Sequence, residues 1–465
     1  MLSHARASWV WLALAMIVAA TAIPSLRESG LLAIVVIVVG VAIAWRDAVI
    51  GVALLAASIP MQDVAPLAIG GVSLTWTRLA LLALIIGWCL RGRWLHARID
   101  MVTWGHVAIL VALTVSVLAN PAIGGWAEEL YRWLAAAVAY VVARDVVRSD
   151  RDRVVVLGGV AAGVVGVSLA AIVQVVQQDG PPSYIVNGVL RAYGTFGAPN
   201  PFAAYLEMSL FVLVAMMPLI WSLAVARIRT IALAVTGGAI SLGGVSLLLT
   251  QSRGGWLGCA AGAVVLWLAM SRTIRWRLGA IGAIVLVAVL VSPFGSRVED
   301  RLGSIAEPSG PIEVTSATWA NEERRAHWGA ALAMMEDHPW TGVGAGAFDD
   351  RYREYTPVWR FRIGRGHAHN GFLQMGAQAG IPGLAAFACW IIAMIGTLVR
   401  ARSFVNDPRQ RFIMAGGIAT VIAFVVHSLV DYLNVLSLGI QLSVVLAVSL
   451  ASLRTSHETP SRLTR

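Results

Sequence analysis

The stretch IALAVTGGAISLGGVSLLLTQSRGGWLGCAAGAVVLWLAM, residues 231–270, decides the fold, because it holds two apolar runs joined by a short polar turn. The runs, 230–249 and 254–271, approach the ~20 residues that an α-helix needs to cross a bilayer. The turn between them is so short that Arg253 must sit at the membrane boundary. We therefore expect a pair of membrane-spanning helices here.

The rest of the chain repeats this pattern. Of its 465 residues, 58% are hydrophobic and 13% are charged, whereas soluble domains carry about 25% charged residues. These figures predict an all-α, polytopic membrane protein with 12–14 transmembrane helices. The predicted helices are 8–25, 31–45, 48–62, 76–90, 101–118, 127–145, 153–176, 203–224, 230–249, 254–271, 277–293, 371–399, 411–429 and 435–452.

The predicted helices at the start of the chain need a further comment. The runs 31–45 and 48–62 are broken only by Arg46–Asp47, so they are either two spans or one span and a re-entrant segment. The first run has no convincing small-residue cleavage site, so we interpret it as a retained helix and not as a signal peptide.

Charge gives the orientation of the helices. All 35 basic residues are arginines and the net charge is +10, but their position in short loops argues against a nucleic-acid partner. Alternate short loops rich in arginine mark the cytoplasmic face. The segments 177–202, 250–253 and 294–370 then face the other side. The arginines of these short loops are Arg91, Arg93, Arg98, Arg144, Arg148, Arg151, Arg153, Arg227, Arg229, Arg272, Arg275, Arg277, Arg400, Arg402, Arg409 and Arg411.

The pattern divides the chain into four regions: transmembrane helices with short loops (1–293), a large polar loop (294–370), C-terminal transmembrane helices (371–453) and a cytoplasmic tail (454–465). Within the large loop, NEERRAHWGAALAMMEDHP (321–339) has helical periodicity, and TGVGAGAF (341–348) is typical of a glycine-rich turn. We expect a partly helical loop domain. The cysteines, Cys89, Cys259 and Cys389, lie in apolar runs, which predicts no disulfide or metal–thiolate site.

Three arginines lie where predicted helices meet the outer side: Arg191, Arg253 and Arg324. An arginine at this boundary costs desolvation unless something anionic meets it, and its planar guanidinium suits phosphate oxygens. The alternative for each is a contact with lipid headgroups or a structural ion pair. Three on one side of the membrane favour an anion site.

The segment GHAHNGFLQMGAQAGIPG, residues 366–383, places His367, His369 and Asn370 at the mouth of a span. Histidine has an unperturbed pKa of about 6.5, so its neutral ring can accept a proton at physiological pH. Alternatively His369 caps the helix or meets lipid headgroups. Asp431, one turn after His427, either orients a partner or makes a structural hydrogen bond, and Asp349–Asp350 is typical of a solvated turn.

These blocks carry a resemblance to a known family. His369–Asn370, followed after nine residues by Gly380-x-x-Gly383, is similar to the signature of the O-antigen ligase family, within the wider O-antigen ligase/polymerase superfamily. RAYGTFGAPNPFAAYL (191–206), TQSRGG (250–255) and ERRAHWGAALAMMEDHPWTGVGAGAF (323–348) resemble its other recurring blocks. The resemblance covers the chain from Arg191 to about Ala385.

The resemblance implies a glycosyltransferase of the GT-C type in the bacterial cytoplasmic (inner) membrane, with a large periplasmic loop. Such enzymes transfer a glycan from undecaprenyl pyrophosphate to an acceptor hydroxyl, as in lipopolysaccharide biosynthesis, without a metal ion or other cofactor. By position, His369 matches the general base, Arg191 and Arg324 match arginines that hold the pyrophosphate, and Arg253 matches a further conserved block. We assign Asn370 and His367 to substrate binding as well.

The partners implied are the lipid-linked glycan donor, a glycolipid acceptor such as lipid A–core, and membrane lipids. Two alternatives share the chemistry: a polymerase, whose acceptor is another lipid-linked repeat, and a protein O-oligosaccharyltransferase. A flippase or other transporter is a third alternative. It predicts charges along a central cavity and often a repeated topology, whereas few charges lie in mid-span here and no repeat is evident.

Overall fold

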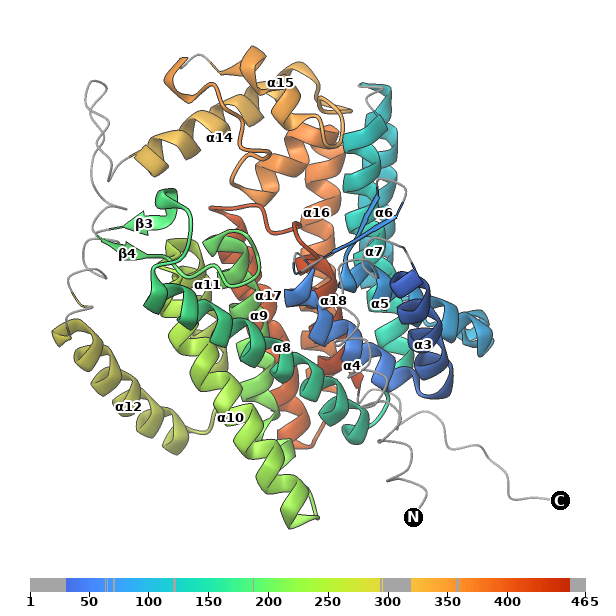
Figure 1. The fold of residues 1–465 in the computed structure, drawn as a ribbon, viewed down its shortest axis with the longest axis vertical. Coiled ribbons are helices and arrows are strands. Elements are labelled where there is room, and N and C mark those ends of the chain that lie inside the picture. Colours follow the sequence, from blue (N-terminus) through green and yellow to red (C-terminus); the bar gives the residue numbers. More distant parts are fainter. Residues whose placement is uncertain are drawn as a thin grey trace.

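The computed structural model describes residues 31–62, 64, 66–69, 72–119, 123–186, 188–292, 295, 319–356 and 359–451. Over these residues the protein is an all-α, polytopic membrane protein (Figure 1). The predicted helix 8–25 and the predicted cytoplasmic tail lie outside the described residues. Every predicted helix from residue 31 onward corresponds to an observed helix, with ends that differ by a few residues.

The helices, in chain order, are α3 (Leu31–Arg46), α4 (Ala48–Ser58), α5 (Trp76–Leu90), α6 (Met101–Val115), α7 (Ile123–Val146), α8 (Asp150–Gln177), α9 (Pro199–Trp221), α10 (Ala226–Leu249), α11 (Arg253–Ala269), α12 (Arg272–Val291), α14 (Trp319–Asp337), α15 (Phe348–Tyr355), α16 (Gly371–Ser403), α17 (Pro408–Ser428) and α18 (Leu438–Ser449). Short 3₁₀ segments are η1 (Ile59–Met61), η2 (Arg93–His96), η3 (Ser116–Leu118), η4 (Pro182–Tyr184) and η5 (Trp359–Phe361). Two small antiparallel hairpins pair β1 (Leu67–Ile69) with β2 (Val72–Leu74), and β3 (Ile185–Val186) with β4 (Val189–Leu190).

Length and composition identify the spanning helices. Among the described residues, six helices are long and apolar enough to cross a membrane: α6 with η3, α8, α9, α10, α16 and α17. Shorter apolar helices are α3, α4 with η1, α5, α11 and α18. α9 is the most enclosed of the six, with 83% of its most apolar window buried, so it lies at the centre of the bundle.

α3 and α4 form a tight antiparallel pair, with Asp47 capping α4 through the N–H groups of Val49 and Ile50. Ala44 near the end of α3 lies against Gly87 in the last turns of α5. Ser58 at the end of α4 accepts a hydrogen bond from Thr77, in the first turn of α5, at 2.9 Å. The chain thus passes twice between the two ends of α5, which favours two spans over a re-entrant segment.

The two ends of the bundle differ. α14 and α15 lie together at one end, over the start of α16 (Figure 1), and we call this the loop end. The arginine-rich connections α5–α6, α7–α8, α9–α10, α11–α12 and α16–α17 lie at the other, arginine end, as the charge pattern predicts. The described part of the large loop has a small core of Ala330, Met334, Phe348 and Tyr352 that Ala377 of α16 completes. The boundaries of the four predicted regions stay a prediction.

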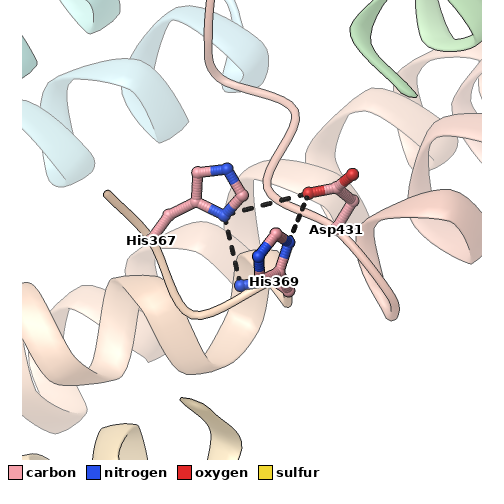
Figure 2. A group of neighbouring side chains, drawn as sticks. All are labelled: His367, His369 and Asp431. Atoms are coloured by element: carbon pink, nitrogen blue, oxygen red, sulfur yellow. Dashed lines mark hydrogen bonds and ion pairs between the residues drawn. The ribbon is translucent and has the colours of Figure 1, made fainter. Parts of the chain in front are cut away.

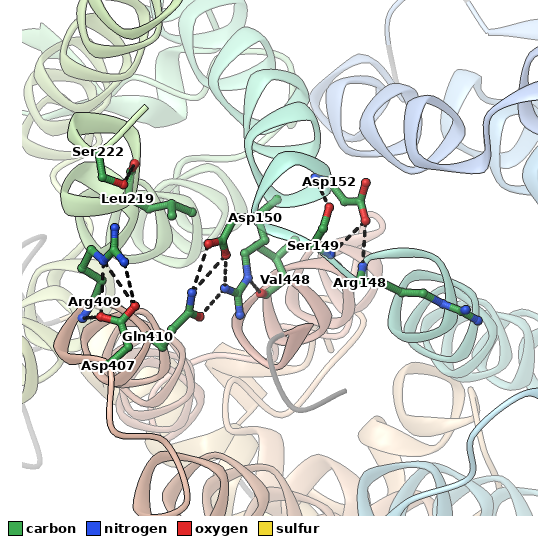
Figure 3. A network of polar contacts seen from close by, with 11 residues as sticks. Arg148, Ser149, Asp150, Asp152, Leu219, Ser222, Asp407, Arg409, Gln410 and Val448 are labelled. Atoms are coloured by element: carbon green, nitrogen blue, oxygen red, sulfur yellow. Dashed lines mark hydrogen bonds and ion pairs between the residues drawn. The ribbon is translucent and has the colours of Figure 1, made fainter. Parts of the chain in front are cut away.

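Buried polar contacts join the helices at the arginine end (Figure 3). The guanidinium of Arg153 on α8 is buried; its Nε donates to the carbonyl of Val448 on α18 at 3.0 Å. It also donates to Asp150 at 2.8 Å and to Gln410 on α17. Gln410 in turn donates to Asp150 at 3.0 Å. These contacts fix α8, α17 and α18 relative to one another.

α16 is interrupted near the loop end. Ala379 and Gly380 have non-helical backbone angles, and Gly380 has φ +66°. The freed backbone groups bond to the turn after α14: the N–H of Ile381 donates to Pro339 at 2.7 Å, and the carbonyl of Ala377 accepts from Val343 at 2.8 Å. The GIPG sequence therefore makes a break that docks the loop on the bundle, and we assign it no chemistry.

Candidate active site

Asp431 is the centre of a polar cluster at the loop end of the bundle. It lies in the segment 429–437 between α17 and α18, and its side chain is buried. Its Oδ1 is 3.3 Å from Nδ1 of His369 and 3.8 Å from Nδ1 of His367 (Figure 2). Its Oδ2 accepts a hydrogen bond from Asn200, in the first turn of α9, at 2.7 Å. Residues distant in sequence thus meet at one carboxylate.

His369 is held in a strained backbone conformation. Its φ is +50°, a left-handed region that costs a non-glycine residue about 1–2 kcal/mol and that is over-represented at functional sites. The indole of Trp328 on α14 donates to its carbonyl at 3.2 Å. Its own N–H donates to Nδ1 of His367 at 3.2 Å. Contacts from α14 and from the loop itself therefore fix the ring of His369 beside Asp431.

The hydrogen bonds assign different states to the two histidines. An ionised carboxylate only accepts, so Nδ1 of His369 carries the proton that it donates to Asp431, and its Nε2 is the basic nitrogen. Nδ1 of His367 accepts a backbone N–H and carries no proton. Burial lowers the pKa of His367 to about 4. The neighbouring His369, His327 and Arg132 act in the same direction, and Asp431 acts against them. His367 is therefore neutral at physiological pH.

Asp431 stays ionised despite its burial. Burial alone would raise its pKa, but the hydrogen bond from His369 and the neighbouring rings of His369, His367 and His427 outweigh that effect. The pKa of Asp431 is therefore well below its usual range. A permanently ionised carboxylate fixes the tautomer of His369 and stabilises the ring when it takes up a proton.

Arg191 reaches this centre through Asn200. Its Nη2 donates to Oδ1 of Asn200 at 3.0 Å and its Nε donates to the carbonyl of Thr250 at 2.9 Å. Oδ1 of Asn200 also accepts from the hydroxyl of Ser252 at 3.0 Å. Because Arg253 follows Ser252 and begins α11, two of the three predicted arginines come from neighbouring elements around Asn200.

Arg324 approaches from α14. Its Nε donates to the carbonyl of Val430 at 3.1 Å, directly beside Asp431, and its Nη1 donates to Ala320 at 3.3 Å. The structure therefore places Arg191 beside Asn200, which donates to Asp431, and Arg324 at the carbonyl of Val430, the residue before Asp431. Arg253 follows Ser252, which donates to the same Asn200.

Asn370 has the contacts of a helix cap. Its Oδ1 accepts from the N–H groups of Phe372 and Leu373 at 2.9 and 3.1 Å, in the first turn of α16. Its Nδ2 donates to the carbonyl of Leu429 at 2.9 Å. Asn370 thus ties α16 to the segment that carries Asp431, and the capping alternative that the sequence left open for His369 applies to Asn370.

Of the cluster, Asn200 was missed in the sequence and Asp431 was not assigned to the site. Asn200 lies inside the block RAYGTFGAPNPFAAYL, which drew attention only for its arginine and glycines. Asp431 was weighed equally as an orienting group and as a structural one. Position at the mouth of a span was the available signal for both, since Asn200 and Asp431 stand at helix ends on the loop end of the bundle.

His367, His369 and Asp431 also resemble a metal-binding set, because one ligand-type atom from each lies within 4.8 Å of the others. Two histidines and one carboxylate are a known donor set for divalent metals. Here, however, Nδ1 of His367 already accepts the N–H of His369. That a metal takes no part stays a prediction.

Comparison with known families gives one match. The family model described as O-antigen ligase matches residues 238–388, a stretch that includes Arg253, Arg324, His367, His369 and Asn370. A search of curated proteins found no match. The matched region joins most of the predicted site residues to an enzyme family of the glycosyltransferase type. The chain is thus similar to the O-antigen ligase family over residues 238–388.

Proposed function

We propose that this protein transfers a glycan from undecaprenyl pyrophosphate to an acceptor hydroxyl, with a glycolipid such as lipid A–core as the acceptor. The observation that carries the proposal is the hydrogen bond between His369 and Asp431, at the same end of the bundle as Arg191, Arg324 and the start of α11 at Arg253. A base beside an anion site is the combination that glycosyl transfer from a pyrophosphate needs.

The reaction is a single displacement. The acceptor oxygen attacks the anomeric carbon, and the bond between that carbon and the pyrophosphate oxygen breaks with inversion at the carbon. The hydroxyl proton passes to Nε2 of His369. The negative charge that develops on the pyrophosphate is stabilised by Arg191, Arg324 and Arg253.

The other residues act by position. Asp431 holds the tautomer of His369 and stabilises its protonated ring. His367 supports the strained backbone of His369 by accepting its N–H, and as a neutral ring its Nε2–H is available to a substrate oxygen. Asn370 fixes the start of α16. The loop end faces the periplasm and the arginine end faces the cytoplasm, in the bacterial cytoplasmic membrane.

Purified full-length protein tests these roles. We expect His369→Ala to lower transfer by about 10²–10⁴-fold, the usual contribution of a general base. Arg191→Ala should weaken donor binding. The control is Arg351→Ala, on the exposed face of α15, which should keep wild-type activity. Full transfer by His369→Ala would show that another group is the base, and unaltered donor binding by Arg191→Ala would remove the pyrophosphate role.

Chelation tests the absence of a metal. Transfer should be unchanged after dialysis against EDTA. A loss of activity that one divalent cation restores in wild type, but not in His367→Gln, would instead assign a metal to His367, His369 and Asp431.

Deletion of the gene in its host, followed by a glycolipid gel, tests the acceptor class. Loss of all glycan from the final glycolipid, with accumulation of lipid-linked polymer, is expected for a ligase. Acceptors that retain a single repeat indicate a polymerase, and loss of glycan from protein alone indicates an O-oligosaccharyltransferase. Accumulation of unpolymerised lipid-linked repeat on the cytoplasmic side indicates a transporter, and no change in any glycan would reject the proposal.

A further inference from the structure

A second polar cavity lies beside the cluster around Asp431 and is not used by the chemistry above. Its volume is about 190 Å³, and it is enclosed by η1, α5, α7 and the segment that leads into α18. Lining residues that bear on its chemistry are Gln62, Arg78, Glu128, Tyr131, Arg132 and Asn434. The side chain of Glu128 is 55% exposed, so the cavity reaches the surface there.

The lining suits a neutral polyhydroxylated ligand. Arg132 donates to Glu128 at 2.5 Å and to Glu129 at 3.1 Å, so its charge is balanced within the protein. The guanidinium of Arg78 lies over the ring of Tyr131, 5.0 Å from its centroid. A guanidinium paired with carboxylates, a guanidinium on an aromatic ring, two amides and a phenol offer the mixed donors and acceptors that sugar hydroxyls need.

Gln62 supplies an independent sign of a ligand. The residue is 3% exposed, lines the cavity, and its Nε2 has no hydrogen-bond partner among the residues that the structure describes. A buried amide donor left unpaired costs about 1–3 kcal/mol. A hydroxyl oxygen of a bound ligand would satisfy it.

Two buried residues, Tyr432 and Glu129, link the histidine pair to Arg132 in the cavity wall. The N–H of Tyr432 donates to Oδ1 of Asp431 at 2.8 Å, and its hydroxyl donates to Glu129 on α7. The ring of His367 is 6.0 Å from the ring of Tyr432. A ligand that contacts Arg132 is therefore connected to Asp431 through the hydrogen bonds of Glu129 and Tyr432.

The cavity and the arginines contact opposite ends of the same segment. Arg324 bonds to Val430 at the start of the segment 429–437, and Asn434 and Ser437 line the cavity near its end. Asp431 lies between them. In a displacement with inversion the attacking oxygen approaches from the side opposite the leaving group. With the pyrophosphate on the arginine side, the cavity is on the acceptor side.

We propose that this cavity binds one sugar ring of the acceptor, which makes Gln62 and Arg78 specificity-determining residues. The assignment rests on the proposed function. A cavity of about 190 Å³ that opens at Glu128 has room for a sugar ring and a path for the rest of the acceptor.

The test uses full-length protein in lipid nanodiscs. The donor is the lipid-linked glycan fraction, and the acceptor the glycolipid fraction, both extracted from the deletion strain. Gln62→Leu removes the amide at nearly constant size, and Arg78→Met removes a charged donor. Each should raise the KM for the acceptor fraction about tenfold, the effect of about 1.4 kcal/mol, and leave the donor dissociation constant unchanged. Arg351→Met is the matched control.

The possible results separate the two proposals. A rise in the donor dissociation constant, with an unaltered acceptor KM, would make the cavity a donor-sugar site and overturn the inference. Unaltered constants in both variants would overturn it too. If Gln62→Leu fails to bind donor, Arg78→Met alone decides. A wild-type protein that binds donor but transfers nothing to any glycolipid would reject the proposed function and not the cavity's ability to bind sugar, which binding of methyl glucoside and methyl galactoside then measures.

Discussion

At the scale of single residues, His369 is distinguished from His367 by its contacts and not by its residue type. One ring donates to an ionised carboxylate and keeps a basic nitrogen, whereas the other accepts a backbone N–H and stays neutral. The left-handed backbone of His369 lets its ring contact Asp431 while its N–H bonds to His367, two residues earlier.

Asp431→Asn tests this division. We expect transfer to fall by about 10–10²-fold, less than for His369→Ala, because an amide cannot stabilise the protonated ring and can favour the wrong tautomer. The donor dissociation constant should stay unchanged, and the acidic limb of the pH–rate profile should move to a new position. Asp407→Asn at the arginine end is the control. Unchanged kcat and profile in Asp431→Asn would leave Asp431 a structural residue only.

His367 predicts a pH dependence of stability. Its pKa is about 4 in the folded protein and about 6.5 when unfolded, so the unfolded state binds the proton first as the pH falls. Stability should therefore decrease between about pH 6.5 and pH 4. His327, whose pKa burial also lowers, acts in the same direction. The lowered pKa of Asp431 acts only below its unfolded value of about 3.9.

Thermal unfolding of detergent-solubilised protein measures this effect. The apparent Tm of wild type should fall from pH 6.5 to pH 4, and His367→Gln should fall less over the same range. Parallel curves for the two proteins would mean that His367 titrates normally in the folded state.

At the scale of elements, the break in α16 joins the large loop to the bundle. A helix continued through Gly380 would bury the N–H of Ile381 and the carbonyl of Ala377 in its own ladder, and the turn after α14 would lose both partners. α14 carries Arg324 and Trp328, so the break determines where these two side chains meet the segment 429–437.

Gly380→Ala tests the break. An added Cβ would lie 2.4 Å from the carbonyl oxygen of Pro339, and φ +66° is unfavourable for alanine. We expect a loss of about 1–3 kcal/mol in stability and lower transfer activity. Gly396→Ala, on the same helix with nothing within 4 Å of the added Cβ, is the control. Equal apparent Tm values for the two variants would contradict this role of Gly380.

At the scale of the whole molecule, arginine has different uses at the two ends. The buried Arg153 at the arginine end is bound by Asp150, Gln410 and Val448, and so joins three helices. At the loop end, Arg191 and Arg324 donate to neutral oxygens of Asn200, Thr250, Ala320 and Val430. These hydrogen bonds orient the two guanidinium groups.

Arg153→Met should therefore lower stability and not donor affinity. Loss of the buried guanidinium leaves the carbonyl of Val448 and the amide of Gln410 short of a partner, which costs about 1–3 kcal/mol. A lower apparent Tm with an unchanged donor dissociation constant is expected. Arg409→Met removes an exposed pair with Asp407 and should change little. Weaker donor binding in Arg153→Met would contradict a purely structural role for this arginine.

The helices could be read from the sequence because hydropathy acts locally. Apolar runs such as 230–249 must form helices to satisfy their backbone groups in lipid, whatever their neighbours. α14 was predicted as 321–339 and is Trp319–Asp337, because its apolar spacing and Pro339 are local signals. α15 was not predicted, since the eight residues FDDRYREY carry mainly charged groups and pack through Phe348 and Tyr352 alone.

The sequence by itself thus determined a polytopic helical membrane protein, the end that carries the large loop, and the arginines and histidine that make up the candidate site. Only the tertiary structure decided which of these groups meet, because hydrogen bonds across more than 60 residues depend on how α9, α16 and α17 pack. Asp431 and Asn200 became members of the site through that packing, and Asn370 became a cap. The cavity that Gln62 lines could not be predicted from any single segment, because its lining residues come from four separate parts of the chain.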